Sequence, residues 1–124
     1  MRLLLDTHLL LWALSEPKRI GRQGLALIAR AQVFISAASI WEISIKSAQG
    51  KLEINPRIVL NSVEPAGFSM LSITGEHVTR VYDLGGHHND PFDRLLVAQA
   101  QVESMTLLTN DKILAEYGSG VQVL

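Results

Sequence analysis

Short apolar runs alternate along this chain with segments of helical periodicity, and this alternation constrains the fold more than any other feature. The runs indicate buried strands, and apolar residues recur at helical spacing in the segments between them. The predicted strands cover residues 2–5, 33–35, 70–73, 106–108 and 121–123. The predicted helices cover residues 9–14, 21–31, 37–49 and 90–104, with others beginning near residues 56, 74 and 111. Such alternation is typical of βαβ units, so we expect an α/β fold with a mostly parallel sheet covered on both faces.

The composition fits a single domain over residues 1–124. Hydrophobic residues make up 48% and charged residues 19%, which supports a buried core and argues against disorder. The absence of cysteine excludes a disulfide framework, a thiolate metal site and a cysteine nucleophile. No apolar run approaches the roughly 20 residues of a membrane span, so we expect a cytoplasmic protein with no membrane partner. The net charge of −1 does not indicate a nucleic-acid partner, and phosphate binding would need a local basic strip.

Carboxylates are predicted to gather beyond the carboxyl ends of the strands, where open parallel sheets bind their ligands. Asp6 directly follows the first strand, Asp111 follows the fourth, and Glu42 lies one turn into the helix after the second. Asp93 lies in the first turn of the helix that enters the fourth strand, and its distance from this edge is left open. Gathered carboxylates repel one another unless a cation neutralises them, and hard oxygen ligands suit Mg²⁺ or Mn²⁺. Such a metal site activates water and stabilises charge on a phosphate during displacement.

Two of these acids also have a purely structural interpretation. Asp6 is a suitable N-cap for the helix that follows it, since an acid at a helix start is favourable. Glu42 belongs to a narrow polar stripe, where it would form a solvated pair with Lys46 at a spacing of four residues. Position alone does not decide between these roles and a metal site.

The acids of the later motifs have structural alternatives too. With Pro91 at the first helical position, Asp90 is the expected N-cap, and Asp93 falls in the first turn without a capping role. Asp111 follows Asn110, itself a good cap, and is then only a first-turn acid. Because Asp90 is explained by the cap, we assign it to structure first and to the site second.

Four motifs, taken together in their order and spacing, resemble those of the PIN-domain ribonucleases, and most closely the VapC-type toxins of bacterial toxin–antitoxin pairs. Each motif is weak alone, but together they run nearly the length of the chain. They are residues 3–8 (LLLDTH), 36–43 (SAASIWEI) followed by Lys46 and 50–52 (GKL), 90–100 (DPFDRLLVAQA), and 108–111 (LTND).

This resemblance implies a PIN-like, Rossmann-like α/β/α sandwich in which carboxylates coordinate Mg²⁺ or Mn²⁺ for the cleavage of RNA. By motif, Asp6 and Asp93 match the metal-binding acids, Glu42 matches the helical glutamate, and Asp111 matches the fourth acid, which varies more within the family. The resemblance also implies a homodimer and a small antitoxin protein that inserts a segment into the acidic groove.

Polar neighbours of the acids complete the candidate site. Thr7 and Thr109 look like the hydroxyl residues that position acids or substrate in that family, and Asp90 belongs to a variant form of the third motif. The basic residues closely follow proposed acids, so they either neutralise substrate phosphates or pair with the acids, and we favour pairing. They are Lys46, Arg94 and Lys112.

Histidine and tryptophan give weaker indications. His87 and His88 form a loop pair, for which solvent exposure is the simpler interpretation and metal or substrate contact the alternative. His8 is assigned to packing. Trp12 and Trp41 lie in apolar helical runs and are predicted to be in the core, with base stacking as the alternative.

Two other classes of function compete with a nuclease. A phospho-acceptor receiver domain shares the length and the acidic pocket, but it would need an acidic pair after the first strand, where Thr7 follows Asp6, and a lysine after the last strand. A non-catalytic binding module would use the acidic pocket only for its partner. The presence of an acid at every motif position argues against loss of activity.

Overall fold

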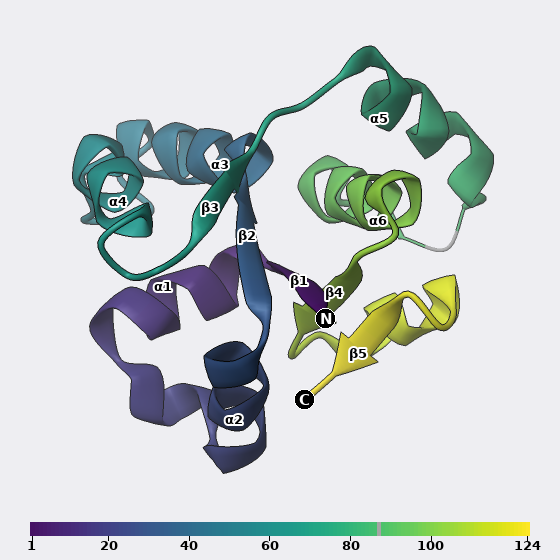
Figure 1. Ribbon diagram of the computed structural model, residues 1–124. Helices are drawn as coiled ribbons and strands as arrows, with labels where there is room; N and C mark the ends of the chain where they lie inside the picture. The colour runs from purple at the N-terminus through teal and green to yellow at the C-terminus, as the bar shows by residue number, and fades with distance from the viewer. Residues whose placement is uncertain (87) are drawn as a thin grey trace.

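The computed structural model describes residues 1–86 and 88–124, and its centre is a five-stranded sheet in the order β3-β2-β1-β4-β5. Every strand pair in the described chain is parallel, so the predicted mostly parallel sheet is wholly parallel (Figure 1). The strands are β1 (Arg2–Leu5), β2 (Gln32–Ser36), β3 (Ser69–Leu71), β4 (Thr106–Thr109) and β5 (Val121–Val123). The third strand ends two residues earlier than predicted, and the other strands lie where the sequence placed them.

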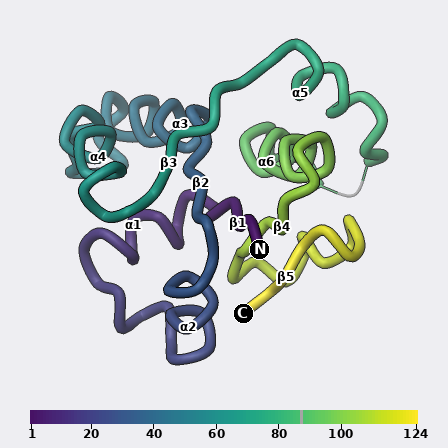
Figure 2. The backbone as a smooth tube through the Cα atoms, in the orientation of Figure 1, coloured from purple at the N-terminus to yellow at the C-terminus, as the bar shows by residue number. Residues whose placement is uncertain are grey.

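Helices cover both faces of the sheet and complete an α/β sandwich (Figure 1). The chain crosses from the side of α1–α4 to the side of α5 and α6 after β3 (Figure 2). The helices are α1 (Thr7–Ser15), α2 (Arg22–Arg30), α3 (Ala37–Ala48), α4 (Pro56–Val63), α5 (Gly75–Arg80) and α6 (Pro91–Glu103), with 3₁₀ turns η1 (Pro17–Ile20), η2 (Val81–Leu84) and η3 (Lys112–Tyr117). The last predicted helix is therefore a 3₁₀ helix. None of the described helices has the length and apolar character needed to cross a membrane.

The alternation of side chains along the central strand explains why both faces are covered. Leu3 and Leu5 pack into one hydrophobic cluster, with α1, α2 and α4, whereas Leu4 packs into the other, with α6. All three are fully buried. A strand that is apolar on both faces is stable only between two layers, which is the pattern of a parallel sheet.

Local signals end and begin the helices beside the site as predicted. Gly50 follows α3 with φ of +75°, a conformation that glycine adopts without steric strain. Asp90 caps α6, with Pro91 at its first position. Trp12 packs partly buried against the core, as predicted, but the prediction for Trp41 is wrong because this side chain is 54% exposed. The contact of Trp41 with Phe92 of α6 is edge-on, with ring centroids 4.9 Å apart.

Candidate metal-binding active site

The carboxyl ends of the central strands open into one polar cavity of about 240 Å³. Three helical elements begin there, because a residue at or just after the end of β1, β2 and β4 caps the next helical element; these residues are Asp6, Ser36 and Asp111. The cavity is lined by Asp6, Thr7, His8, Glu42, Lys46, His88, Asp90, Asp93 and Asp111. The four predicted acids therefore face one space, together with Asp90.

Asp6 is the most rigidly held of these acids. Its backbone N–H donates to Leu108 O at 3.1 Å, which fixes the residue at the edge of β4. Its Oδ1 accepts from the backbone N–H of Leu9 at 2.8 Å, and its Oδ2 accepts from Thr109 Oγ1 at 2.5 Å. Burial raises the pKa of Asp6, and the hydrogen bond from Thr109 opposes that rise. The predicted cap is confirmed, and Thr109 orients this acid directly.

Glu42 differs from the solvated residue that the polar stripe suggested. It is 6% exposed, and its Oε2 accepts from Lys46 Nζ at 2.6 Å. Its other oxygen, Oε1, is buried and has no hydrogen-bond partner in the described part of the chain. The hydrogen bond to Glu42 raises the pKa of Lys46. The predicted pair of Lys46 with an acid is confirmed, but it lies at the cavity wall and not on a solvated face.

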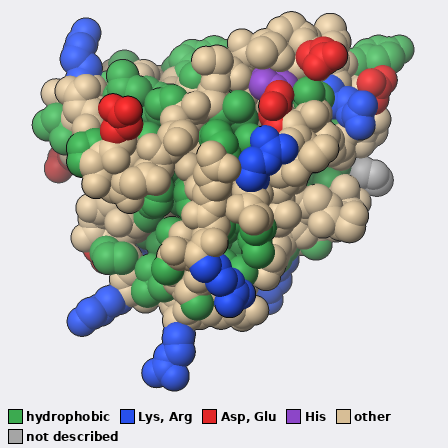
Figure 3. Space-filling model, in the orientation of Figure 1, with side chains coloured by type: hydrophobic (Ala, Val, Ile, Leu, Met, Phe, Trp, Pro, Cys, Tyr) green, Lys and Arg blue, Asp and Glu red, His purple; other side chains and the backbone are tan. Residues whose placement is uncertain are grey.

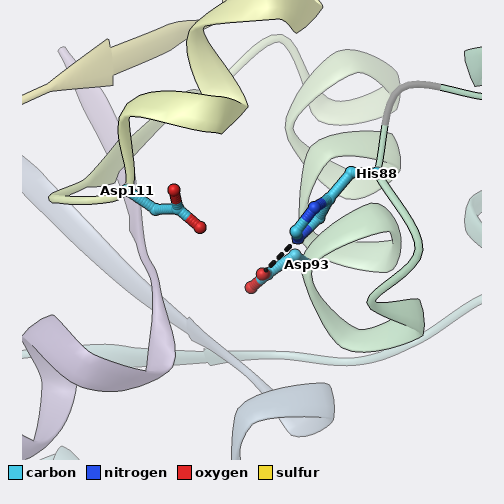
Figure 4. A group of neighbouring side chains, drawn as sticks. All are labelled: His88, Asp93 and Asp111. Carbon is cyan, nitrogen blue, oxygen red and sulfur yellow. Dashed lines mark hydrogen bonds and ion pairs between the residues drawn. The ribbon is translucent and has the colours of Figure 1, made fainter.

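Asp93 forms a compact group with His88 and Asp111 (Figure 4). One ligand atom from each of the three lies within 4.8 Å of those of the other two, and His88 Nε2 is 2.9 Å from Asp93 Oδ2. Burial raises the pKa of Asp93, and the hydrogen bond with His88 opposes that rise. Figure 4 shows the three side chains pointing toward a shared space from separate segments. Asp6 and Glu42 line the same cavity but lie outside this compact group.

His88 is more enclosed than predicted, because solvent exposure was the simpler interpretation of its sequence. The loop places its ring against the first turn of α6, and it is half-buried. The sequence signal that could have indicated its contact with Asp93 is the spacing, since His88 precedes this first-turn acid by five residues. His87, its neighbour in the predicted pair, lies outside the described residues.

The capping residues differ in one respect from the prediction. Asp90 Oδ1 accepts from the backbone N–H groups of Phe92 at 2.8 Å and Asp93 at 3.2 Å, so this cap is confirmed. Asp111 itself caps η3, accepting from Ile113 N at 3.0 Å, and the assignment of the cap to Asn110 is wrong.

The other predicted neighbours have mixed outcomes. Arg94 does not pair with an acid among the described residues, because its guanidinium donates to Val81 O and His88 O, both at 3.2 Å, and to Gly85 O at 2.5 Å. It thereby fastens the loop that carries His88. Thr7 Oγ1 donates to Ser39 Oγ at 3.0 Å, and Lys112 is exposed outside the cavity lining.

This donor set fits a divalent cation. The buried Oε1 of Glu42, which has no partner among the described residues, has the cost of an unsatisfied polar atom, and burial disfavours the ionised forms of Asp6 and Asp93 by raising the pKa of each. A bound cation offsets both effects, and hard carboxylate oxygens suit Mg²⁺ or Mn²⁺. His88 adds an imidazole nitrogen, a ligand that transition-metal ions accept more readily than Mg²⁺ does.

A carboxylate-lined cavity at the carboxyl edge of a wholly parallel sheet defines an α/β protein with a candidate site for cations. The sequence matches the PIN domain over residues 3–119, and the chain belongs to the PIN domain family. The match contains all four predicted acids. No curated protein matches the sequence.

Solved structures share the fold at low sequence identity. A chain from the crystal structure of VapBC2 from Rickettsia felis, bound to a DNA fragment from the promoter, superposes with a TM-score of 0.72 at 18% identity, covering 100% of this chain and 98% of that chain. A toxin–antitoxin complex from Klebsiella pneumoniae gives 0.66 at 21% identity, covering 97% and 95%. FitAcB from Neisseria gonorrhoeae gives 0.65 at 20%, covering 96% and 95%.

Proposed function

We propose that this chain is a metal-dependent endoribonuclease that acts as the toxin of a VapC-type toxin–antitoxin pair. The observation that carries the proposal is the gathering of the four motif acids around one cavity in a PIN domain. Fold likeness to chains from toxin–antitoxin complexes supports the toxin assignment. A receiver-like phospho-acceptor is disfavoured, because Asp6 is 4% exposed and both of its oxygens already accept hydrogen bonds.

In the proposed mechanism, Asp6 and Asp93 would hold Mg²⁺ or Mn²⁺, with Glu42 and Asp111 beside them. A divalent cation bound there would supply a water of lowered pKa and neutralise charge that develops on the phosphate. Glu42 Oε1, buried and unpaired, accepts a proton or hydrogen bond from a water in the cavity. Lys46 fixes the other oxygen of Glu42.

The backbone and the remaining side chains position these groups. Thr109 orients Asp6, and His88 holds Asp93 Oδ2 by a hydrogen bond at 2.9 Å. Asp90 holds the first turn of α6, on which Asp93 lies. Preorganised groups of this kind need little rearrangement when charge develops in the transition state.

Cleavage of single-stranded or loop RNA tests the proposal. We expect cleavage with Mg²⁺ or Mn²⁺ that stops on addition of a chelator and is lost in Asp6→Asn and Asp93→Asn. Asp83→Asn is the matched control, because Asp83 is an exposed acid on η2 outside the cavity. Cleavage that persists in both cavity variants, or that withstands chelation, would refute the assignment.

Two partners complete the proposal: a small antitoxin and a second copy of the chain in the cytoplasm. The exposed Trp41 and its neighbour Phe92 leave an apolar surface between α3 and α6, which favours a homodimer. Light scattering of the wild type and of Trp41→Ser measures this. A wild-type protein that stays monomeric at high concentration would argue against the dimer.

A further inference from the structure

One segment of this near-neutral chain is strongly basic. Residues 17–41 contain no aspartate or glutamate and carry a formal charge of +4, whereas the rest of the chain carries −5. The basic residues of the segment are exposed and form no ion pair within the described parts of the chain; they are Lys18, Arg19, Arg22 and Arg30. Lysine and arginine side chains project from the lower part of the face in Figure 3, where Figure 1 places α2. This is the local basic strip that the net charge conceals.

A row of three side chains joins this basic segment to the acidic cavity. His8, in the first turn of α1, is exposed and lines the cavity, so its assignment to packing is wrong. The Trp12 ring lies one turn further along α1, with its centroid 6.4 Å from that of His8. The Arg19 guanidinium, on η1, lies over the Trp12 ring at 4.5 Å from its centroid. Stacking on the indole holds the exposed guanidinium in place while its N–H groups remain available.

The cavity itself continues toward this row. A smaller hollow of about 60 Å³ shares Thr7, His8, Glu42 and Lys46 with the acidic cavity and extends to Leu11 of α1 and Leu52. Leu11 immediately precedes Trp12. A surface hollow therefore runs between α1 and α3 from the acids toward the aromatic row.

We propose that the surface formed by His8, Trp12 and Arg19, with the basic residues of η1 and α2, binds the single-stranded RNA that extends from the cleavage site. The proposal rests on the ribonuclease function proposed above and names the surface that holds its substrate. The carboxylates of the cavity repel every RNA phosphate that is not bound to the metal ion. A polyanion such as RNA therefore needs positively charged side chains outside the cavity. Four exposed basic side chains that have no carboxylate partner among the described residues supply them, and the rings of His8 and Trp12 offer faces on which unpaired bases stack. A surface of cations and aromatic rings matches single-stranded nucleic acid better than an acidic peptide, which matches only the charge.

Fluorescence in a chelator tests binding separately from cleavage. In a Trp41→Phe background, Trp12 is the only indole, so quenching on titration with an oligoadenylate of about ten nucleotides reports on this surface. We expect quenching by the oligoadenylate, and much weaker quenching by an abasic oligonucleotide of the same charge or by polyglutamate. Equal quenching by polyglutamate would assign the surface to an acidic protein segment, and no quenching by any of the three would exclude contact at Trp12. Either result overturns the proposal.

A matched pair of charge variants locates the phosphate contact. In the same background, Arg19→Gln should weaken oligoadenylate binding about tenfold and reduce the slope of log K against log salt by about 0.7, as expected for the loss of one phosphate contact on a single strand. Arg80→Gln, which removes an exposed arginine of α5 on the other side of the sheet, should change neither quantity. Equal effects of the two substitutions would mean that only net charge matters, and would overturn the proposal.

A substrate without bases separates this proposal from the proposed nuclease activity. Hydrolysis of bis(p-nitrophenyl) phosphate with Mn²⁺ should be unchanged in Arg19→Gln, while kcat/KM for RNA falls about tenfold. Equal losses on both substrates would place Arg19 in support of the cavity and refute the binding surface. If the wild type hydrolyses neither substrate, the nuclease proposal fails, whereas the binding measurements in chelator still decide whether this surface holds RNA.

Discussion

Replacing Thr109 by valine removes one hydroxyl from the most deeply buried part of the site and changes the shape of the side chain little. Thr109 is fully buried, donates to Asp6 Oδ2 at 2.5 Å and accepts from the backbone N–H of Asp111 at 3.0 Å. A hydrogen bond to a charged group contributes about 1.5–3 kcal/mol, and the neutral bond to the Asp111 amide adds about 1 kcal/mol. We therefore expect Thr109→Val to lower the free energy of unfolding by about 2–4 kcal/mol, or roughly 10 °C in Tm for a chain of this size.

The pH dependence shows whether the lost bond belongs to ionised Asp6. The Thr109 hydrogen bond favours the carboxylate, so without it the pKa of Asp6 rises further above its ordinary value. The difference in stability should then be largest above the pKa of Asp6 in the variant and should shrink as the pH falls through it. Calorimetry of wild type, Thr109→Val and Thr109→Ser in chelator measures this, and the serine variant keeps the hydroxyl. A Tm loss in the valine variant of less than about 2 °C, or one that is independent of pH, would refute the reasoning.

Two further predictions concern the acids of α6. Burial raises the pKa of Asp93, so between the unfolded and folded pKa values of this residue the native state binds more protons, and the stability of the metal-free protein falls as the pH rises. In Asp93→Asn, Tm should therefore fall less over that pH window, and Mn²⁺ should raise Tm less than in the wild type. Equal slopes of Tm against pH in the two proteins would contradict this. Asp90→Ala removes the acceptor for the backbone N–H groups of Phe92 and Asp93, so the free energy of unfolding measured in urea should fall by about 1 kcal/mol. Asp90→Asn keeps the cap and should retain both stability and RNA cleavage. If Asp90→Asn keeps its stability but loses cleavage, Asp90 belongs at the metal.

Much of the fold could be predicted because its signals are local. The apolar runs identify the strands, and Gly50 and Pro91 mark helix ends that the structure confirms. The exposure of Trp41 could not be predicted, because an apolar helix does not reveal which part of its surface lacks a neighbour. Likewise, the position of the His88 ring depends on a loop that Arg94 fastens through hydrogen bonds to the carbonyl groups of Gly85 and Val81, and no periodic pattern encodes such contacts.

Capping and metal binding, which the sequence offered as alternative roles for Asp6 and Asp90, are compatible in this structure. Asp6, Asp90 and Asp111 each accept backbone N–H groups at the start of a helix and each line the cavity. A carboxylate oxygen has two lone pairs, so a cap occupies only part of the acceptor capacity and fixes the direction of the rest. The positive end of the α1 or α6 dipole also lessens the repulsion between the gathered acids. Because the strands are parallel, several helices begin at the same edge of the sheet, beyond the carboxyl ends of the strands. The residues that cap these helices can therefore also line the site. A capping assignment therefore does not count against a functional one where helices begin side by side.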